Sequence, residues 1–280
     1  MGPNTIDWQH NPSPRQGPVL EQLGERGQQA SSICPKFTVI TVVLNDLKEL
    51  IRTISSVDQQ SGVSYEHLIV DGGSTDGTLE WLNEHSHQHR QLHLFPEQGI
   101  YEAMNRAVSQ SRGEWLHFLN AGDTYSEKSS LERVSRHCCG DRDLIYTDVY
   151  RELAGRVSLW KQKPPFFWGI YRNICHQGIF YRRPILPTPA FETHYRVGAD
   201  FDNLLRLQME HPQLTIHYHP EALVHWKTGG FSLKHASEAL KERKASLISR
   251  INSPTLRCLN MINLFRQKLK LRLLGWDRVR

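Results

Sequence analysis

The sequence predicts an α/β fold in which a mostly parallel central sheet carries helices on both faces. Strand-like and helix-like patterns alternate four times between residues 37 and 123, as parallel strands joined by crossover helices require. The first strand-like run, 37–44, is rich in β-branched residues, which is typical of a strand buried on both faces. Two expected strands end in turns that combine Gly with Asp, at the place where open α/β sheets bind ligands.

Length and composition fit one main domain with appendages. Of the 280 residues, we assign 1–35 to a flexible N-terminal extension, 36–232 to the main domain and 233–280 to a C-terminal helical region. The extension lacks the basic start and apolar block of a secretory signal. No apolar run approaches the ~18 residues that a membrane-spanning helix needs.

Cysteine usage and charge exclude several classes of protein. Five scattered cysteines with no Cys-x-x-Cys pair argue against a disulfide framework or a structural zinc site, and they fit the reducing cytoplasm. The formal net charge is +5, while 255–280 alone contains seven basic residues and one acidic residue. The positive charge therefore belongs to a tail, and we expect no nucleic-acid partner.

A helix is expected directly after the first strand. Asn45 or Asp46 caps it, and Glu49 stands where a capping box would place it. Further strands are expected at 66–70 and 92–95, with another helix between them. This order continues the parallel pattern.

Asp71 follows the second expected strand and begins a turn with two glycines. It is either an ordinary turn aspartate or a group that binds a ligand at the strand end. Neither Gly-x-Gly-x-x-Gly nor a P-loop pattern occurs in the sequence. A Rossmann dinucleotide site and a P-loop are therefore disfavoured.

The segment 99–123 organises the rest of the chain. Apolar residues at helical spacing from Ile100 form one buried stripe, and Gly113 ends the helix. A short strand at 115–119 then leads into a loop that ends at Asp123. An acidic residue on a turn of small residues is a reasonable place to hold a metal ion and a diphosphate.

The second half is less regular. The patterns predict helices at 130–138, from about 200 and at 233–250, strands at 143–150, 155–160, 214–219 and 221–225, and a glycine-hinged loop at 226–232. The aromatic segment 164–168 is expected to be irregular and either forms a wall for a sugar ring or packs under a loop. The tail 255–280 predicts a basic amphipathic helix, which either lies on an anionic membrane or packs within the domain or a homo-oligomer.

Four segments resemble successive motifs of the family 2 inverting glycosyltransferases, in order and spacing as well as content. They are Thr41-Val-Val-Leu-Asn45, Val70-Asp-Gly-Gly-Ser-Thr-Asp-Gly-Thr78, Gly99-Ile-Tyr-Glu-Ala-Met-Asn105 and Gly113-Glu-Trp-Leu-His-Phe-Leu-Asn-Ala-Gly-Asp123. The resemblance is strong over 36–125 and traceable to about 232. It implies the GT-A fold, which is Rossmann-like, and transfer of a sugar from a nucleotide-diphosphate donor to an acceptor hydroxyl with inversion.

The resemblance implies a nucleotide site at the ends of the first strands. Thr41 and Asn45 would lie at the end of the first strand, beside the nucleotide. Asp71 would accept a hydrogen bond from the base, which we expect to be the uracil of a UDP-sugar. Asn105 would lie near the donor sugar and diphosphate.

The resemblance also implies a metal site. Asp123 matches a carboxylate of the family's Asp-x-Asp-type motif, and Asn120 faces the donor beside it. Asn120 and Gly122 stand where relatives often have aspartates. One carboxylate, with diphosphate oxygens and water, can still hold Mg²⁺ or Mn²⁺, although we expect weaker binding.

Asp200 matches the aspartate that acts as catalytic base in the resembling family, where a Glu often precedes it and this chain has Ala199. A carboxylate at a helix start also suits a simple cap. His176 and Gln177 match the acceptor side of the donor pocket. For His176 a purely structural role is the competing interpretation.

The resemblance implies that His225 approaches the metal or diphosphate, and we expect Lys227 to neutralise phosphate charge there. A structural role is the default interpretation for His225. The glycine-hinged loop that contains Lys227 would close over the donor and exclude water.

The resemblance implies a cytoplasmic glycosyltransferase that acts on a saccharide or lipid-linked acceptor, and the protein is peripheral at the inner face of the membrane if the tail binds lipid rather than protein. One alternative is a sugar-phosphate nucleotidyltransferase, although no glycine-rich, basic triphosphate loop follows the first strand. Another is a non-catalytic nucleotide-sugar-binding module at the membrane.

Overall fold

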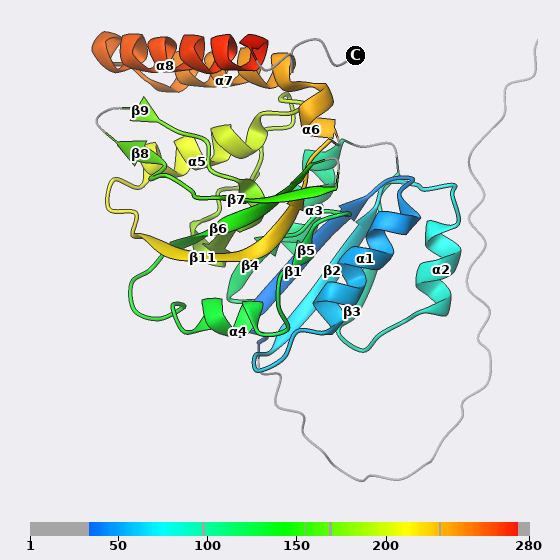
Figure 1. The fold of residues 1–280 in the computed structure, drawn as a ribbon. Helices are drawn as coiled ribbons and strands as arrows, with labels where there is room; N and C mark the ends of the chain where they lie inside the picture. Colours follow the sequence, from blue (N-terminus) through cyan, green and yellow to red (C-terminus); the bar gives the residue numbers. More distant parts are fainter. Residues whose placement is uncertain (1–33, 97–98, 154, 168–169, 230, 274–280) are drawn as a thin grey trace, which may run out of the picture. The chain divides into compact units, whose positions relative to one another are not determined.

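A computed structural model describes residues 34–273 without 97–98, 154, 168–169 and 230. The expected N-terminal extension lies outside the described residues except for Cys34 and Pro35, as does the tail beyond residue 273. Within the described part, nine strands form one sheet and two short strands form a separate hairpin (Figure 1).

The first four strands form the parallel half of the sheet, in the order β3-β2-β1-β4. They are β1 Phe37–Val43, β2 Tyr65–Asp71, β3 Arg90–Leu94 and β4 Trp115–Phe118. Every residue of β1 is buried, as its apolar sequence predicts. The expected α/β architecture is confirmed here.

Beyond β4 the sheet becomes mixed. The strands are β5 Thr124–Tyr125, β6 Leu144–Leu153, β7 Arg156–Trp160, β10 Ile179–Arg182 and β11 Ile216–Lys227. β10 is antiparallel to both β4 and β6, and β11 is parallel to β6. The carboxyl ends of β1, β2, β4, β6 and β11 consequently meet at the same edge of the sheet.

Helices cover both faces of the sheet, as predicted. They are α1 Leu47–Asp58, α2 Thr78–Glu84, α3 Ile100–Gln110, α4 Ser130–Ser135, α5 Ala199–Glu210, α6 Phe231–Lys234, α7 Ala236–Arg250 and α8 Pro254–Leu273, with 3-10 turns at His176–Gly178 and Arg183–Ile185. Ile40 of β1 packs with Met104 of α3 in one core cluster. Val39, the next residue back, packs with Val57 of α1 and Val134 of α4 in another. Alternating residues of one strand thus supply two separate apolar layers.

The start of α1 differs from the expected cap. Asp46 occupies the N-cap position, but its side chain makes no capping hydrogen bond to a described residue. Asp76 Oδ2, from the loop after β2, instead accepts the Leu47 N–H at 3.0 Å. Glu49 pairs with Lys227 and Arg52 rather than completing a capping box. A residue distant in sequence therefore replaces the local cap.

Three predictions in the second half were wrong. The two closing strands are one bulged strand, β11, which extends to Lys227, so the expected loop begins only after this residue. The aromatic segment is partly regular, because β8 Phe166–Phe167 pairs with β9 Ile170–Tyr171; Trp168 lies outside the described residues. The expected helix at 130–138 already ends at Ser135.

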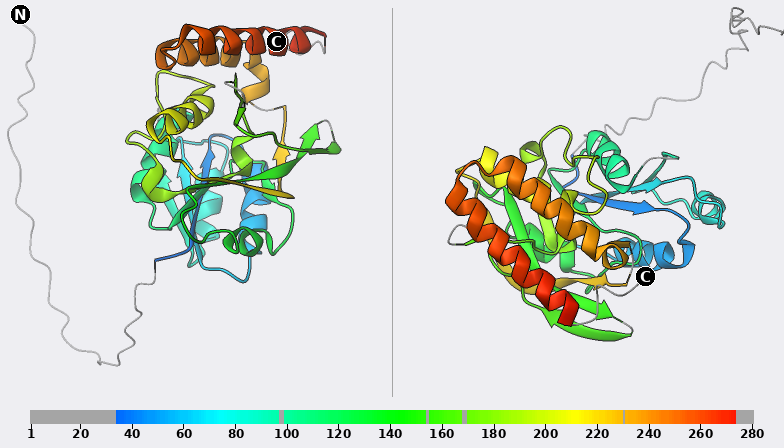
Figure 2. Two further views of the ribbon diagram at one scale, coloured as in Figure 1. Left: turned by 90° about the vertical axis from the view of Figure 1, so that its left-hand side faces the viewer. Right: turned by 90° about the horizontal axis from the view of Figure 1, so that it is seen from above.

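The C-terminal helices pack against the main domain through α5 (Figure 2). Phe201 and Leu205 of α5 form a buried cluster with Leu247 of α7 and Ile251. Leu256 and Leu264 of α8 pack against this cluster. Among the described residues, no helix combines the length and apolar character needed to cross a membrane.

Candidate functional site

Three aspartates come from separate elements. Asp71 is the last residue of β2, Asp123 follows the turn after β4, and Asp200 lies in the first turn of α5. Burial raises the pKa of the Cys175 thiol well above its usual range, and the carboxylates of Asp123 and Asp200 raise it further. Both carboxylates therefore act electrostatically on the same thiol.

Asp71 is fully buried, and only one of its two carboxylate oxygens has hydrogen-bond partners among the described residues. Its Oδ1 accepts the N–H groups of Gly73 at 2.8 Å and Ser74 at 2.7 Å, which fixes the turn. Its Oδ2 is buried and has no hydrogen-bond partner among the described residues. A buried carboxylate oxygen without a partner carries a large desolvation cost, so it favours a ligand N–H.

Asn45 joins the loops after β1 and β2. Its backbone has φ of 52°, a left-handed conformation that Asn tolerates. The Asn45 N–H donates to Ser74 Oγ at 2.8 Å, and Asn45 Oδ1 accepts the Thr75 N–H at 2.8 Å. Asn45 is exposed, and its two hydrogen bonds connect the loop after β1 to the turn that follows Asp71.

Thr41 does not lie at the strand end. It is fully buried inside the sheet, where its hydroxyl donates to the Leu119 carbonyl at 2.7 Å and contacts His67 Nε2 at 2.9 Å. Thr41 lies two residues before the end of β1 and its hydroxyl is engaged inside the sheet, so its expected place beside the nucleotide stays a prediction.

Asp123 is 4% exposed, and burial raises its pKa to about 8. Three groups oppose that rise: the Lys227 N–H, which donates to Asp123 Oδ1 at 2.9 Å, the Gln177 amide and the Lys227 charge. Cys175 Sγ donates to Gln177 Oε1 at 3.2 Å. Gln177 thus connects the buried thiol to the carboxylate.

The turn before Asp123 contains a second oxygen suited to a cation. Asn120 Oδ1 is buried and lacks a hydrogen-bond partner within the described ranges. Gly122 has φ of +98°, which disfavours a side chain there. The described residues contain no cluster of three or more His, Cys, Asp or Glu that could bind a metal ion. A metal here would draw on a single protein carboxylate.

Lys227 and His225 lie at the end of β11, beside this turn. Lys227 Nζ pairs with Glu49 at 2.5 Å, and the lysine side chain is 37% exposed. His225 is opposite Thr124 in the sheet and stacks on Tyr150 with ring centroids 4.8 Å apart. Burial lowers the pKa of His225. Lys227 therefore contributes both a backbone N–H and a positive charge to the surroundings of Asp123.

Asp200 is partly buried at the start of α5, and this burial raises its pKa above the usual range. The Arg243 charge opposes the rise, and Glu242 adds to it. Asp200 Oδ1 accepts the Phe201 N–H at 2.7 Å. A carboxylate with a raised pKa at a site edge is suited to proton transfer.

Glu242 of α7 fixes the backbone that precedes α5. Its Oε2 accepts the N–H groups of Val197 at 2.9 Å and Gly198 at 2.7 Å, and its Oε1 accepts that of Arg196 at 2.8 Å. Sequence analysis missed this residue, because its partners are backbone groups 44 to 46 positions away. The C-terminal helices therefore help to position Asp200.

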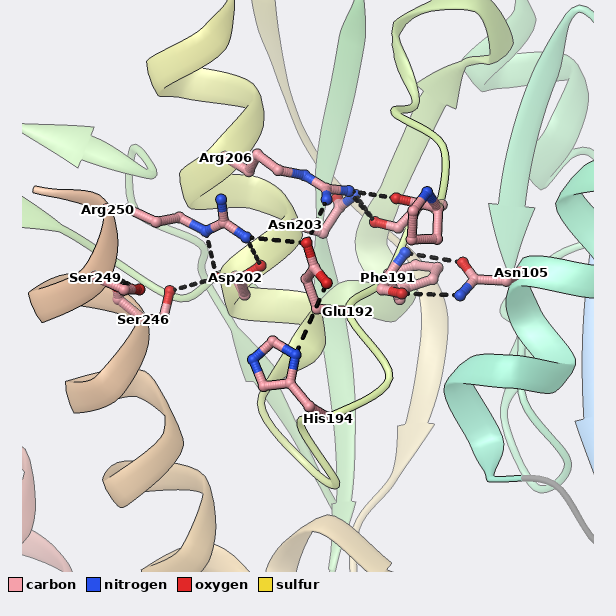
Figure 3. Close-up of polar contacts among 12 residues, drawn as sticks. Asn105, Phe191, Glu192, His194, Asp202, Asn203, Arg206, Ser246, Ser249 and Arg250 are labelled. Atoms are coloured by element: carbon pink, nitrogen blue, oxygen red, sulfur yellow. Dashed lines mark hydrogen bonds and ion pairs between the residues drawn. The ribbon is translucent and has the colours of Figure 1, made fainter.

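Asn105 makes two hydrogen bonds to the backbone of the loop that contains Phe191 (Figure 3). Its Nδ2 donates to the Phe191 carbonyl and its Oδ1 accepts the Phe191 N–H, both at 2.8 Å. The side chain expected near the donor sugar is thus committed to the loop that leads to Asp200. Its expected place near the donor sugar and diphosphate stays a prediction.

A buried ionic network surrounds the same loop (Figure 3). Asp202 is fully buried and accepts Arg250 Nε at 2.6 Å and Ser246 Oγ at 2.7 Å. Arg206 donates to Glu192 at 3.0 Å and to the Ala190 carbonyl at 2.8 Å. Asp202 is therefore a structural anchor, while Asp200 remains without an arginine hydrogen bond in the described structure.

His176 and Gln177 lie next to each other in the turn before β10. His176 is 6% exposed, and burial lowers its pKa to about 4, so the ring is neutral. Neither ring nitrogen has a hydrogen-bond partner among the residues that the structure describes, and the same holds for the nearby Tyr181 hydroxyl. The ring lies 4.9 Å from Phe118 and 5.6 Å from Phe191, centroid to centroid.

The family model described as "Glycosyl transferase family 2" matches residues 38–198. "PGL/p-HBAD biosynthesis glycosyltransferase" of Mycobacterium bovis is 34% identical over 214 residues, covering 71% of this chain and 79% of the relative. Glycosyltransferase AglE of Haloferax volcanii is 35% identical over 108 residues, covering 37% of this chain and 35% of the relative.

Solved structures share the fold at low sequence identity. Staphylococcus aureus TarS 1–349 in complex with UDP superposes with a TM-score of 0.62 and 17% identity, covering 79% of this chain and 68% of TarS. The Pyrobaculum calidifontis mannosyltransferase PcManGT, in complex with GDP-Man and Mn²⁺, superposes with a TM-score of 0.59 and 16% identity. The match covers 80% of this chain and 67% of PcManGT. The fold is thus GT-A-like, as the sequence resemblance implied.

Proposed function

Because this chain belongs to glycosyl transferase family 2, we propose that it moves a sugar from a UDP-sugar to an acceptor hydroxyl with inversion. Glycosyltransferase activity follows from the family. The observation that supports the specific mechanism is the placement of two carboxyl groups: Asp123 follows the turn after β4, where the Lys227 N–H holds it, and Asp200 lies in the first turn of α5. We assign the first carboxylate to the leaving-group side and the second to the acceptor side.

Asp71 is the proposed recognition group for the base. Its buried Oδ2 lacks a partner among the described side chains and backbone groups, and uracil offers an N–H donor. The two glycines after Asp71 let a planar base approach the backbone closely. TarS has been solved with UDP, and PcManGT with GDP-Man, so the fold itself leaves the choice of base to such contacts.

Asp123 and Asn120 are the proposed protein ligands of Mg²⁺ or Mn²⁺. A lone buried carboxylate with a pKa of about 8 and an unpartnered amide oxygen, judged within the described structure, both gain from a nearby cation. When bound, the ion would neutralise charge on the departing nucleotide diphosphate. Lys227 would add a second positive charge by leaving Glu49 for phosphate.

Asp200 is the proposed general base. It accepts the proton of the acceptor hydroxyl as that oxygen bonds to the anomeric carbon, while the bond from this carbon to the diphosphate oxygen breaks on the opposite face. His176 and Gln177 are the proposed contacts for the acceptor. The proposed acceptor is a cytoplasmic saccharide or lipid-linked molecule in glycolipid or polysaccharide assembly, and the mycobacterial relatives are named as biosynthesis glycosyltransferases.

Thermal stabilisation by a panel of UDP- and GDP-sugars, with and without Mn²⁺, tests the donor. Saturation at a hundredfold excess over Kd would add about 2.7 kcal/mol to the free energy of unfolding. We expect the UDP-sugars to stabilise the protein and to yield free UDP in the presence of an acceptor. Stabilisation without any nucleotide release would favour a non-catalytic module, and pyrophosphate release from a nucleoside triphosphate would favour a nucleotidyltransferase.

A further inference from the structure

α8 has one face packed on the protein and one face exposed. On the packed face, Asn260 is 1% exposed and its Oδ1 accepts the Tyr171 N–H at 2.8 Å. Met261 and Leu264 lie against the cluster formed with α5 and α7. The helix is therefore held in a fixed orientation by contacts within the domain.

The exposed face of α8 is apolar. Ile262, Phe265 and Leu269 are spaced by three and four residues and so share one face. They are 54%, 69% and 49% exposed, and Leu259 beside them is 38% exposed. Large side chains repeated along one exposed helix face cost free energy in water, so this face is suited to an apolar partner.

The charge that α8 itself carries is entirely positive. The sequence of α8 contains five basic residues and no acidic residue. Arg266 and Lys268 are exposed and form no ion pair with any described carboxylate. Apolar side chains flanked by unpaired cations match the interface of an anionic lipid bilayer, where the apolar groups enter the acyl boundary and the cations meet the headgroups.

We propose that the exposed face of α8 binds the surface of an anionic membrane. Figure 1 and the left view of Figure 2 show α7 and α8 on the side of the sheet towards which β1 runs. Asp71 ends β2, which is parallel to β1, so the candidate site is on this side too. Docking through α8 would bring that side of the protein to the lipid surface. A lipid-linked acceptor for the proposed transfer would meet Asp200 there, so the biological use, though not the binding itself, rests on the proposed function.

Co-sedimentation of the full chain with vesicles tests the proposal. The vesicles contain phosphatidylcholine alone or mixed with phosphatidylglycerol. We expect retention only on the anionic vesicles, and less of it at high salt. Replacing the cations in Arg266→Gln/Lys268→Gln should weaken the partition constant about thirtyfold. Ile262→Ser/Phe265→Ser should weaken it about a hundredfold.

Matched controls keep the result specific. Lys128→Gln/Arg136→Gln removes two exposed cations near α4, at the opposite end from α8 (Figure 1). Ile51→Ser/Leu94→Ser removes two apolar side chains that are 37% and 58% exposed on α1 and β3. Both control variants should bind anionic vesicles like the unaltered chain, and equal losses in controls and α8 variants would overturn the proposal.

Two further measurements separate the remaining outcomes. Equal retention on both vesicle types, or a dimer in sedimentation velocity that Ile262→Ser/Phe265→Ser dissociates, would assign the face to another partner and overturn the proposal. UDP release from the donor with a soluble acceptor does not depend on vesicles. Lost vesicle binding with intact UDP release would therefore reject only the membrane surface, whereas intact vesicle binding without UDP release would reject only the proposed function.

Discussion

Glu242 Oε2 accepts the Gly198 N–H at 2.7 Å, which ties the middle of α7 to the N-cap residue of α5. Asp200 follows two residues later. Since Glu242 also bonds the two preceding N–H groups, it holds this backbone on its carboxylate. The helical region after the family motifs therefore holds the backbone that precedes the proposed base.

Glu242→Gln should lower kcat with little change in donor affinity. An amide can replace at most part of the three charge-assisted bonds, so we expect kcat to fall about tenfold to a hundredfold and stability by about 1–3 kcal/mol. Steady-state kinetics and chemical denaturation measure the two effects. Glu238→Gln on the same helix is the matched control. It should leave kcat within twofold and the free energy of unfolding unchanged. A normal kcat in Glu242→Gln would remove its positioning role.

Asp200→Asn should abolish transfer and leave donor binding intact. Loss of a general base typically costs ~10² to 10⁴ in rate, and binding of UDP measured by calorimetry should remain within about threefold. Because burial raises the pKa of Asp200 and the base must be deprotonated, kcat/KM should fall on acidification at a pH above the ordinary aspartate range. Retained turnover in the variant would exclude Asp200 as base.

Asp123→Asn should stabilise the metal-free protein at neutral pH. The folded pKa of about 8 lies above that of an unfolded aspartate, so the folded state binds the extra proton and stability falls as pH rises from about 4 towards 8. The variant lacks this penalty, and we expect it to gain about 1–3 kcal/mol at pH 8 and nothing at pH 4. Urea denaturation across this range checks the sign.

The same substitution should remove stabilisation by Mn²⁺ in the presence of UDP. In the unaltered chain Mn²⁺ must displace the Asp123 proton. The apparent affinity for Mn²⁺ should therefore increase about tenfold for each unit by which the pH is raised, up to about pH 8. Undiminished Mn²⁺ binding in Asp123→Asn would move the metal elsewhere.

Arg250→Leu should strongly destabilise the fold, because it leaves Asp202 buried without its arginine partner. Removing one member of a buried pair costs about 3–5 kcal/mol. The double variant Asp202→Asn/Arg250→Leu should recover part of this loss. Thermal unfolding of both variants tests the pair, and a larger loss in the double variant would contradict it.

Local patterns in the sequence determined the order of strands and helices. Residues 37–43 alternate between two buried faces, and the stripe starting at Ile100 has helical spacing, so each element depends on neighbours in the chain. The same patterns located the turns at Asp71 and Asp123 and the start of α5 near Asp200. The parallel half of the sheet and the family resemblance were both available at this level.

Only the tertiary structure decided what individual polar side chains do. The Thr41 hydroxyl donates a hydrogen bond to the Leu119 carbonyl inside the sheet. Asn105 accepts one from the Phe191 N–H, and Glu242 accepts one from the Gly198 N–H before α5. Each of these contacts spans tens of residues, and hydrogen bonding depends on where distant backbone groups are brought in three dimensions. Sequence periodicity specifies which face of a strand or helix a residue lies on. The packing of segments that are distant in the sequence decides which groups that residue contacts.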